Sequence, residues 1–261
     1  MLRADALGYR HPSATTPALA HVSFELQAGQ FCIVTGNTGS GKSTLARLCA
    51  GLLQRHGGGT VSGSVSVDGR DPGKLSPAER AATVGFVAQT PDDQVVTGTL
   101  GDEIAFALES IALPAPQQEA KVEALLHALG LPPEPNRPVS ALSTGQRQRL
   151  VVAAALAAEP RLLVLDEPLA HLDPAGAREL LARLRLLAEA GTTVLMVEHR
   201  RAVARPYVHA ELHLAGGQLV PPPGGGEPAQ RASPATGGEP AQRPSPATGG
   251  EPAQRPSPAT G

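Results

Sequence analysis

Three short apolar runs without charged residues stand out along the chain, at residues 31–35, 162–165 and 193–197. Uncharged runs of this length are typical of parallel strands that are buried on both faces. A longer stretch, residues 174–190, carries leucines at helical spacing, with Asp173 placed to cap its start and Gly191 to end it. Apolar strands that alternate with amphipathic helices predict an α/β fold built on a parallel sheet.

Two other segments, residues 61–67 and 208–214, alternate apolar and polar side chains. A period of two predicts strands that are antiparallel and half-exposed. Residues 90–159 have helical periodicity instead, which is clearest over 117–129 and 146–158. We therefore expect a helical insert between the predicted strands.

The composition changes abruptly after Val220. Residues 221–261 contain no aliphatic side chain larger than alanine, and from Gly225 a twelve-residue unit rich in Pro and Gly repeats three times. Each unit is too short and too polar to bury a face, and its one Glu and one Arg leave it neutral. We predict a disordered tail that takes no part in the fold.

The overall composition argues against nucleic acid as a partner. The 261 residues carry 24 acidic and 22 basic side chains, and aromatic residues make up 2% with no Trp. The chain therefore lacks both the positive charge and the stacking rings of nucleic-acid-binding surfaces. No apolar stretch reaches the roughly 18 residues of a membrane helix, and no export signal is visible, so we expect a cytoplasmic protein.

The segment 36–43 fits the pattern G-x-x-x-x-G-K-[ST] at every position. It directly follows a predicted strand and precedes a predicted helix, which is the context that a phosphate-binding loop requires. Glycines let consecutive backbone N–H groups surround phosphate oxygens, Lys42 reaches the β and γ phosphates, and Ser43 can bind Mg²⁺. The predicted phosphate-binding residues are Gly36, Asn37, Thr38, Gly39, Ser40, Gly41, Lys42, Ser43 and Thr44.

Two adjacent acids, Asp166 and Glu167, follow the predicted strand 162–165. The carboxyl end of a parallel strand is where α/β proteins bind ligands. We expect Asp166 to hold Mg²⁺ together with Ser43, and Glu167 to activate a water as general base.

With these motifs the chain resembles the ATP-binding-cassette (ABC) ATPases over residues 1–220. The resemblance implies a P-loop NTPase core, an N-terminal antiparallel β subdomain and a helical subdomain at about 90–159. Residues 142–146, Leu-Ser-Thr-Gly-Gln, resemble the Leu-Ser-Gly-Gly-Gln signature of that family, with Thr144 in place of the first glycine. Ser143 and Gln146 also fit a helix capping box, which is compatible with a signature role.

Other single residues match further elements of the family. Gln89 matches the glutamine that reaches the metal and the water, and His199 matches the histidine that contacts the γ-phosphate. Asp173 matches an aspartate at the interface of two cassettes, and Tyr9 matches the aromatic ring that stacks on adenine. Because the family sandwiches ATP between two cassettes, the resemblance implies a dimer in which Ser143, Gly145 and Gln146 complete the site of a partner, either identical or different.

The segment after Gln89 resembles the ATPase subunits of energy-coupling-factor importers, through residues 91–94, Pro-Asp-Asp-Gln, and the acidic helix start at 102–103. This resemblance implies an integral membrane coupling protein and a membrane subunit that captures a vitamin or a metal ion. It also implies a location at the inner face of the membrane. The nucleotide motifs alone also fit another transporter, an iron–sulfur assembly ATPase or a regulatory module without hydrolysis.

Overall fold

A six-stranded sheet forms the centre of the computed structural model, which describes residues 1–53, 58–109 and 111–223. Its strand order is β5-β6-β7-β3-β8-β9, in which the first five strands are parallel and β9 returns antiparallel. The three apolar runs predicted as buried parallel strands are β3, β6 and β7. The strands span Phe31–Gly36 (β3), Val84–Val87 (β5), Leu162–Asp166 (β6), Thr193–Val197 (β7), Ala210–Ala215 (β8) and Gln218–Val220 (β9).

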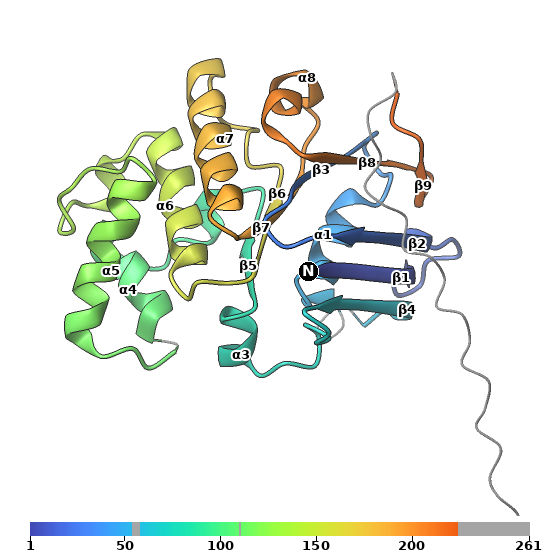
Figure 1. Cartoon of the computed structure of the whole chain (residues 1–261), viewed down its shortest axis with the longest axis horizontal. Helices are drawn as coiled ribbons and strands as arrows, with labels where there is room; N and C mark the ends of the chain where they lie inside the picture. Colours follow the sequence, from blue (N-terminus) through green and yellow to red (C-terminus); the bar gives the residue numbers. More distant parts are fainter. Residues whose placement is uncertain (54–57, 110, 224–261) are drawn as a thin grey trace, which may run out of the picture.

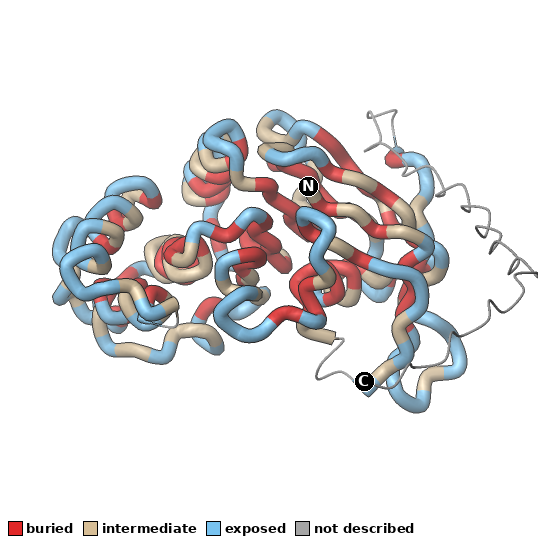
Figure 2. Tube along the Cα trace, turned by 60° about the horizontal axis from the view of Figure 1, so that its bottom comes forward, coloured by how far each residue is buried: buried red, intermediate tan, exposed pale blue. Residues whose placement is uncertain are grey.

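Alternate side chains of the central strands enter two separate cores. Phe31 and Ile33 pack on the face that helices α6 and α7 cover, whereas Cys32 and Val34 pack on the face that carries α1 and a second sheet. Figure 2 shows buried residues concentrated along these strands. Burial on both faces explains why the strands contain apolar residues without interruption.

The second sheet has three antiparallel strands in the order β2-β1-β4, which are Leu2–Arg10 (β1), Leu19–Leu26 (β2) and Thr60–Val67 (β4). It lies beside the central sheet, over α1 (Figure 1). The antiparallel strand predicted at 61–67 is therefore confirmed.

The helices follow from local signals in the sequence. Asp173 accepts a hydrogen bond from the N–H of Gly176 at 2.9 Å and caps α7, as predicted. The Ser143 hydroxyl and the Gln146 side chain form the predicted capping box at the start of α6. The helices that pack on the sheets are α1 (Lys42–Cys49), α3 (Pro77–Ala81), α7 (Pro174–Glu189) and α8 (Arg201–Ala204), followed by the short turn η3 (Arg205–Tyr207).

Between β5 and β6 the described residues form helices and turns that gather at one end of the molecule (Figure 1). Helix α5 begins two residues earlier than the predicted range 117–129, and Val122, Leu126 and Leu129 are buried as their spacing predicts. The elements are η1 (Pro91–Asp93), α4 (Leu100–Glu109), α5 (Ala115–Ala128), η2 (Val139–Ala141) and α6 (Thr144–Leu156).

One predicted strand differs in its pairing. The segment 208–214 was expected to be antiparallel and half-exposed, but β8 runs parallel to β3 and only its other edge pairs antiparallel, with β9. Its acid, Glu211, is only 5% exposed because Arg201 and Thr35 bind it. Because Glu211 is polar, the alternation assigned it to the solvent-facing side, although its carboxylate is buried and hydrogen-bonded.

The predicted disordered tail, residues 221–261, lies outside the described residues except for 221–223. In the described part of the chain, no helix has both the length and the apolar character needed to cross a membrane.

Candidate nucleotide site

The loop between β3 and α1 depends on glycine at three positions. Gly36, Gly39 and Gly41 have φ angles of 144°, 79° and 100°, a region that other residues rarely adopt. A Cβ at Gly41 would lie 2.5 Å from the carbonyl oxygen of Ala18, and one at Gly36 would collide with the carbonyl oxygen of Leu214. A Cβ at Gly39 would meet nothing within 4 Å. The loop is thus packed against its own scaffold on one side and open at Gly39.

Lys42 lies at the start of α1 with its ammonium turned back on the loop. Its Nζ donates to the carbonyl oxygens of Gly36 at 3.0 Å and Asn37 at 2.9 Å. Burial lowers the pKa of Lys42, while the nearby carboxylates of Glu167 and Asp166 raise it and offset part of that effect. Ser40 Oγ is buried and has no hydrogen-bond partner within the described residues. A buried donor without a partner, beside an ammonium and an open glycine loop, fits an oxyanion such as phosphate.

Asp166, at the end of β6, faces the first turn of α1. Its Oδ1 accepts a hydrogen bond from Ser43 Oγ at 2.9 Å, and Arg47 lies 3.9 Å from its other oxygen. Burial raises the pKa of Asp166, and the Ser43 hydrogen bond and the Arg47 charge oppose that shift. A hydroxyl and a carboxylate are hard oxygen donors, so this pair fits Mg²⁺.

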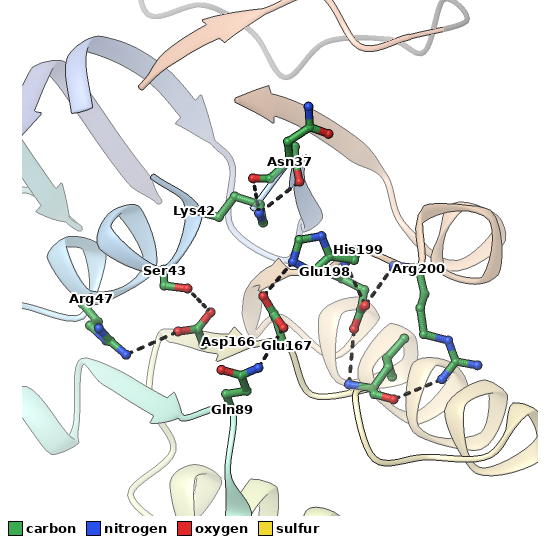
Figure 3. A network of polar contacts seen from close by, with 12 residues as sticks. Asn37, Lys42, Ser43, Arg47, Gln89, Asp166, Glu167, Glu198, His199 and Arg200 are labelled. Atoms are coloured by element: carbon green, nitrogen blue, oxygen red, sulfur yellow. Dashed lines mark hydrogen bonds and ion pairs between the residues drawn. The ribbon is translucent and has the colours of Figure 1, made fainter. Parts of the chain in front are cut away.

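Glu167 is held between two other loops (Figure 3). Gln89 Nε2 donates to Glu167 Oε2 at 3.0 Å, and His199 Nε2 lies 2.9 Å from Oε1. The backbone of Glu167 has a φ of 53°, and its N–H donates to the carbonyl oxygen of Val197 at 2.9 Å. The residue that was predicted to act as general base thus has a strained backbone conformation.

A cavity of about 570 Å³ brings most of the predicted residues together. It is lined by Thr38, Gly39, Gly41, Lys42, Ser43, Thr44, Gln89, Glu167 and His199, and also by His11 and Ala18, which the sequence analysis did not identify. Side chains that were predicted to bind phosphate, to bind the metal and to activate water therefore line the same cavity.

Tyr9 does not line this cavity. Its side chain is only 1% exposed in the core of the three-stranded sheet, so it offers no free face to a base. His11 lines the cavity instead, with its ring edge-on to that of Tyr9 at a centroid distance of 4.8 Å. Tyr9 is therefore corrected from a stacking residue to a core residue that supports His11. Tyr9 stands two residues after the buried Leu7 on β1, and ring or aliphatic side chains at that spacing share one face of a strand, which is the sequence signal for a core position.

The signature residues lie in a different cavity, of about 440 Å³, together with the segment that precedes α7. It is lined by Ser143, Thr144, Gly145, Arg149, His171, Leu172, Asp173, Gly176 and Glu179. Gln146 does not line it, because its side chain accepts a hydrogen bond from the N–H of Ser143 at 2.9 Å and completes the capping box. Within one chain, the predicted nucleotide-binding residues thus divide between two cavities.

The segment after Gln89 makes three contacts that the sequence did not reveal. Asp92 forms an ion pair with Arg147 on α6 at 2.6 Å. Gln94 accepts from the N–H of Ala88 at 2.6 Å, and the buried carboxylate of Glu103 accepts from the N–H groups of residues 96 and 97. Asp92 therefore connects the loop after Gln89 to α6, the helix that begins at the signature residues.

A search against family models matches residues 19–170 to the ABC transporter family. A Streptomyces coelicolor protein named as an ABC transporter ATP-binding protein is 43% identical over 201 residues, which cover 77% of this chain and 36% of that protein. The energy-coupling factor transporter ATP-binding protein EcfA1 of Lacticaseibacillus paracasei is 38% identical, over 76% of this chain and 70% of that protein. The chain spans about a third of the length of the curated relatives that it matches first.

Solved structures agree with these matches. The cbiO1 protein of Clostridium perfringens, part of the ABC transporter complex cbiONQ, has a TM-score of 0.75 and 26% identity, covering 84% of this chain and 86% of that chain. The dimeric ATP-binding cassette MJ0796, bound to ADP and Pi, has a TM-score of 0.73 and 25% identity, covering 88% and 99%. The α/β P-loop fold predicted from the sequence is confirmed, and the chain belongs to the ABC transporter family.

Proposed function

We propose that this chain binds ATP in the 570 Å³ cavity and hydrolyses it to power a membrane transporter. The observation that carries the proposal is the position of Glu167, whose two carboxylate oxygens are held by Gln89 and His199 beside Lys42 and Ser43. These groups supply what phosphoryl transfer to water needs, namely a base, a cation for the phosphates and oxygen donors for a metal.

In the proposed reaction, a water attacks the γ-phosphate in line with the leaving oxygen, and Glu167 takes its proton. Lys42 exchanges its contacts with the carbonyls of Gly36 and Asn37 for the β and γ phosphates. His199 orients the γ-phosphate and Glu167 together. Mg²⁺, held by Ser43, Asp166 and Gln89, would neutralise charge that develops on the phosphate oxygens.

We propose that His11, and not Tyr9, stacks on the adenine ring of the nucleotide. Its ring lines the cavity, and its Nε2 lies 3.5 Å from Thr44 Oγ1 at the start of α1. Buried Tyr9 contacts that ring, and the two ring planes are nearly perpendicular, at 88°. A flat ring that is contacted on one side leaves another side for a purine to stack on.

We further propose that a second cassette, identical or different, completes each site. Ser143, Gly145 and Asp173 line the separate 440 Å³ cavity, so they do not contact a nucleotide held by Lys42 of the same chain. The capped start of α6 offers backbone N–H groups and a hydroxyl to a γ-phosphate from outside. The dimeric form of the related cassette MJ0796 supports this arrangement.

The transporter is proposed to be of the energy-coupling-factor type, importing a vitamin or a metal ion. Support comes from the similarity to EcfA1 and cbiO1 and from the residues 91–94. Near that segment Val96 and Phe106 are 65% and 56% exposed, although both are large apolar side chains. Such residues fit a docked integral membrane coupling protein, which would hold the chain on the inner face of the membrane beside a substrate-binding membrane subunit.

Two measurements test these proposals. Phosphate release from ATP by the purified chain should require Mg²⁺ and should be lost in Lys42→Ala; release that is independent of both would refute the assignment. The chain, expressed with a tag in its natural host, should co-purify with small integral membrane proteins in mild detergent. Recovery only with soluble iron–sulfur proteins would refute the transporter role and leave the ATPase intact.

A further inference from the structure

The loop after β7 is connected to the segment that precedes α7 by a buried carboxylate. Glu198 is only 2% exposed. Its Oε1 accepts hydrogen bonds from the N–H groups of His199 at 2.8 Å and Arg200 at 2.9 Å, and its Oε2 accepts one from the N–H of Leu169 at 3.3 Å. One oxygen thus holds the backbone of residues 198–200, here called the histidine loop, while the other oxygen connects this loop to Leu169.

Arg200 makes the reverse connection. Its Nη1 donates to the carbonyl oxygens of Leu169 and Leu172, both at 3.0 Å. Leu169 and Leu172 are buried, with exposures of 0% and 9%, so the carbonyls are presented by a packed segment. Hydrogen bonds from a charged group to two such acceptors are stronger than neutral ones and fix its direction.

These contacts join the two cavities of the chain. At one end, His199 faces Glu167 in the nucleotide cavity. At the other end, Leu172 and Asp173 line the cavity of the signature residues. The hydrogen bonds that Glu198 accepts and those that Arg200 donates connect these ends directly.

We propose that Glu198 and Arg200 are positioning residues that make the histidine loop and residues 169–173 move as one unit. A change in the contacts of His199 at the γ-phosphate then shifts Asp173 at the surface that meets a second cassette, and the reverse holds. This inference rests on the proposed function, because it gives the unit a role in ATP turnover by a pair of cassettes.

The histidine loop has a second anchor that does not involve residues 169–173. Arg201, in α8, forms an ion pair with the buried Glu211 of β8, and Thr35 of β3 donates to the same carboxylate oxygen. This anchor stays when the other connection is cut. Loss of the Glu198 or Arg200 contacts is therefore expected to uncouple the two segments without unfolding the loop.

Glu198→Gln is a selective variant. An amide oxygen can keep the two bonds to the N–H groups of His199 and Arg200, but the NH₂ group then faces the N–H of Leu169 and cannot accept from it. Arg200→Gln removes the bonds to the two carbonyls. Arg205→Gln is the matched control, because Arg205 is an exposed arginine in η3.

Each variant is tested alone and in a His199→Ala background. Calorimetry with Mg²⁺ and adenylyl imidodiphosphate gives the stoichiometry and the dissociation constant, and single-turnover phosphate release gives the rate. We expect Glu198→Gln and Arg200→Gln to keep the stoichiometry of the wild type and to lower the rate about tenfold, with less than about twofold effect once His199 is absent.

A rate equal to that of Arg205→Gln would overturn the proposal. So would a tenfold loss that persists in the His199→Ala background, since the effect would then not act through the histidine. Lost binding sites in step with the rate would show a folding defect and would also overturn it. If the wild-type chain itself releases no phosphate, the proposed function fails, and that result is recognised before any variant is compared.

Discussion

Replacement of Glu167 by glutamine tests the chemistry with little change in geometry. The side chains have the same length, and the strained backbone, whose N–H is bound to the carbonyl oxygen of Val197, is not altered. The carboxylate now binds Gln89 through one oxygen and His199 through the other. A glutamine amide can keep both contacts, because the amide of Gln89 can rotate to present its oxygen. The substitution therefore removes the carboxylate that can take a proton and keeps the contacts with Gln89 and His199.

The expected loss follows from the role of a general base. Such a group contributes about 10² to 10⁴ in rate, or about 2.7–5.4 kcal/mol of transition-state stabilisation. Nucleotide affinity should change by less than about twofold, since the contacts of Lys42 and Ser43 stay in place. Phosphate release at saturating Mg²⁺ and ATP, with calorimetry on the same preparations, separates the two effects.

Glu189→Gln is the matched control, because this exposed glutamate lies on the surface of α7 and pairs only with Arg185 four residues earlier among the described residues. It should hydrolyse ATP at the wild-type rate. Hydrolysis by Glu167→Gln within a factor of two of that control would refute the assignment of Glu167 as base.

Three other substitutions and one deletion test separate parts of the structure. His11→Ala should weaken the binding of ATP about tenfold in a competition assay and leave the binding of inorganic triphosphate unchanged. Tyr9→Ala should lower the free energy of unfolding in urea by about 3–5 kcal/mol. The opposite pattern would restore Tyr9 as the stacking ring. Asp92→Asn should change the free energy of unfolding by less than about 1 kcal/mol, because the Asp92 side chain is 62% exposed in its ion pair with Arg147, and a larger loss would mark a structural role. Deletion of residues 221–261 should leave phosphate release nearly intact, and a large fall in melting temperature would show that the tail contributes to the fold.

The parts of the site that were predictable from the sequence are those where chemistry fixes the residue type. Only glycine tolerates the φ angles at Gly36 and Gly41, and phosphate and Mg²⁺ require a cation and oxygen donors at fixed spacing. The same holds for the cap at Asp173, where a local hydrogen bond decides the helix start.

The parts that were not predictable depend on contacts between distant segments. Tyr9 lies on β1 and His11 directly follows the end of that strand, and only the packing of the three-stranded sheet decides which ring is buried. Glu198 reads as a polar residue at a strand end, yet it is buried by partners from a segment 29 residues away. The prediction of a half-exposed strand at 208–214 was wrong for the same reason, because Glu211 is polar but buried. Long-range polar contacts leave no period in the sequence.

The proposed function requires that the loop from Gly36 to Ser43 binds a nucleoside triphosphate with the help of a metal. Calorimetric titration of the Glu167→Gln chain with ATP tests it most directly, because this variant does not consume the ligand. We expect one nucleotide per chain in the presence of Mg²⁺, with affinity lost on addition of EDTA and in the variant that also carries Lys42→Ala. Absence of any magnesium-dependent binding of ATP by the folded chain would contradict it.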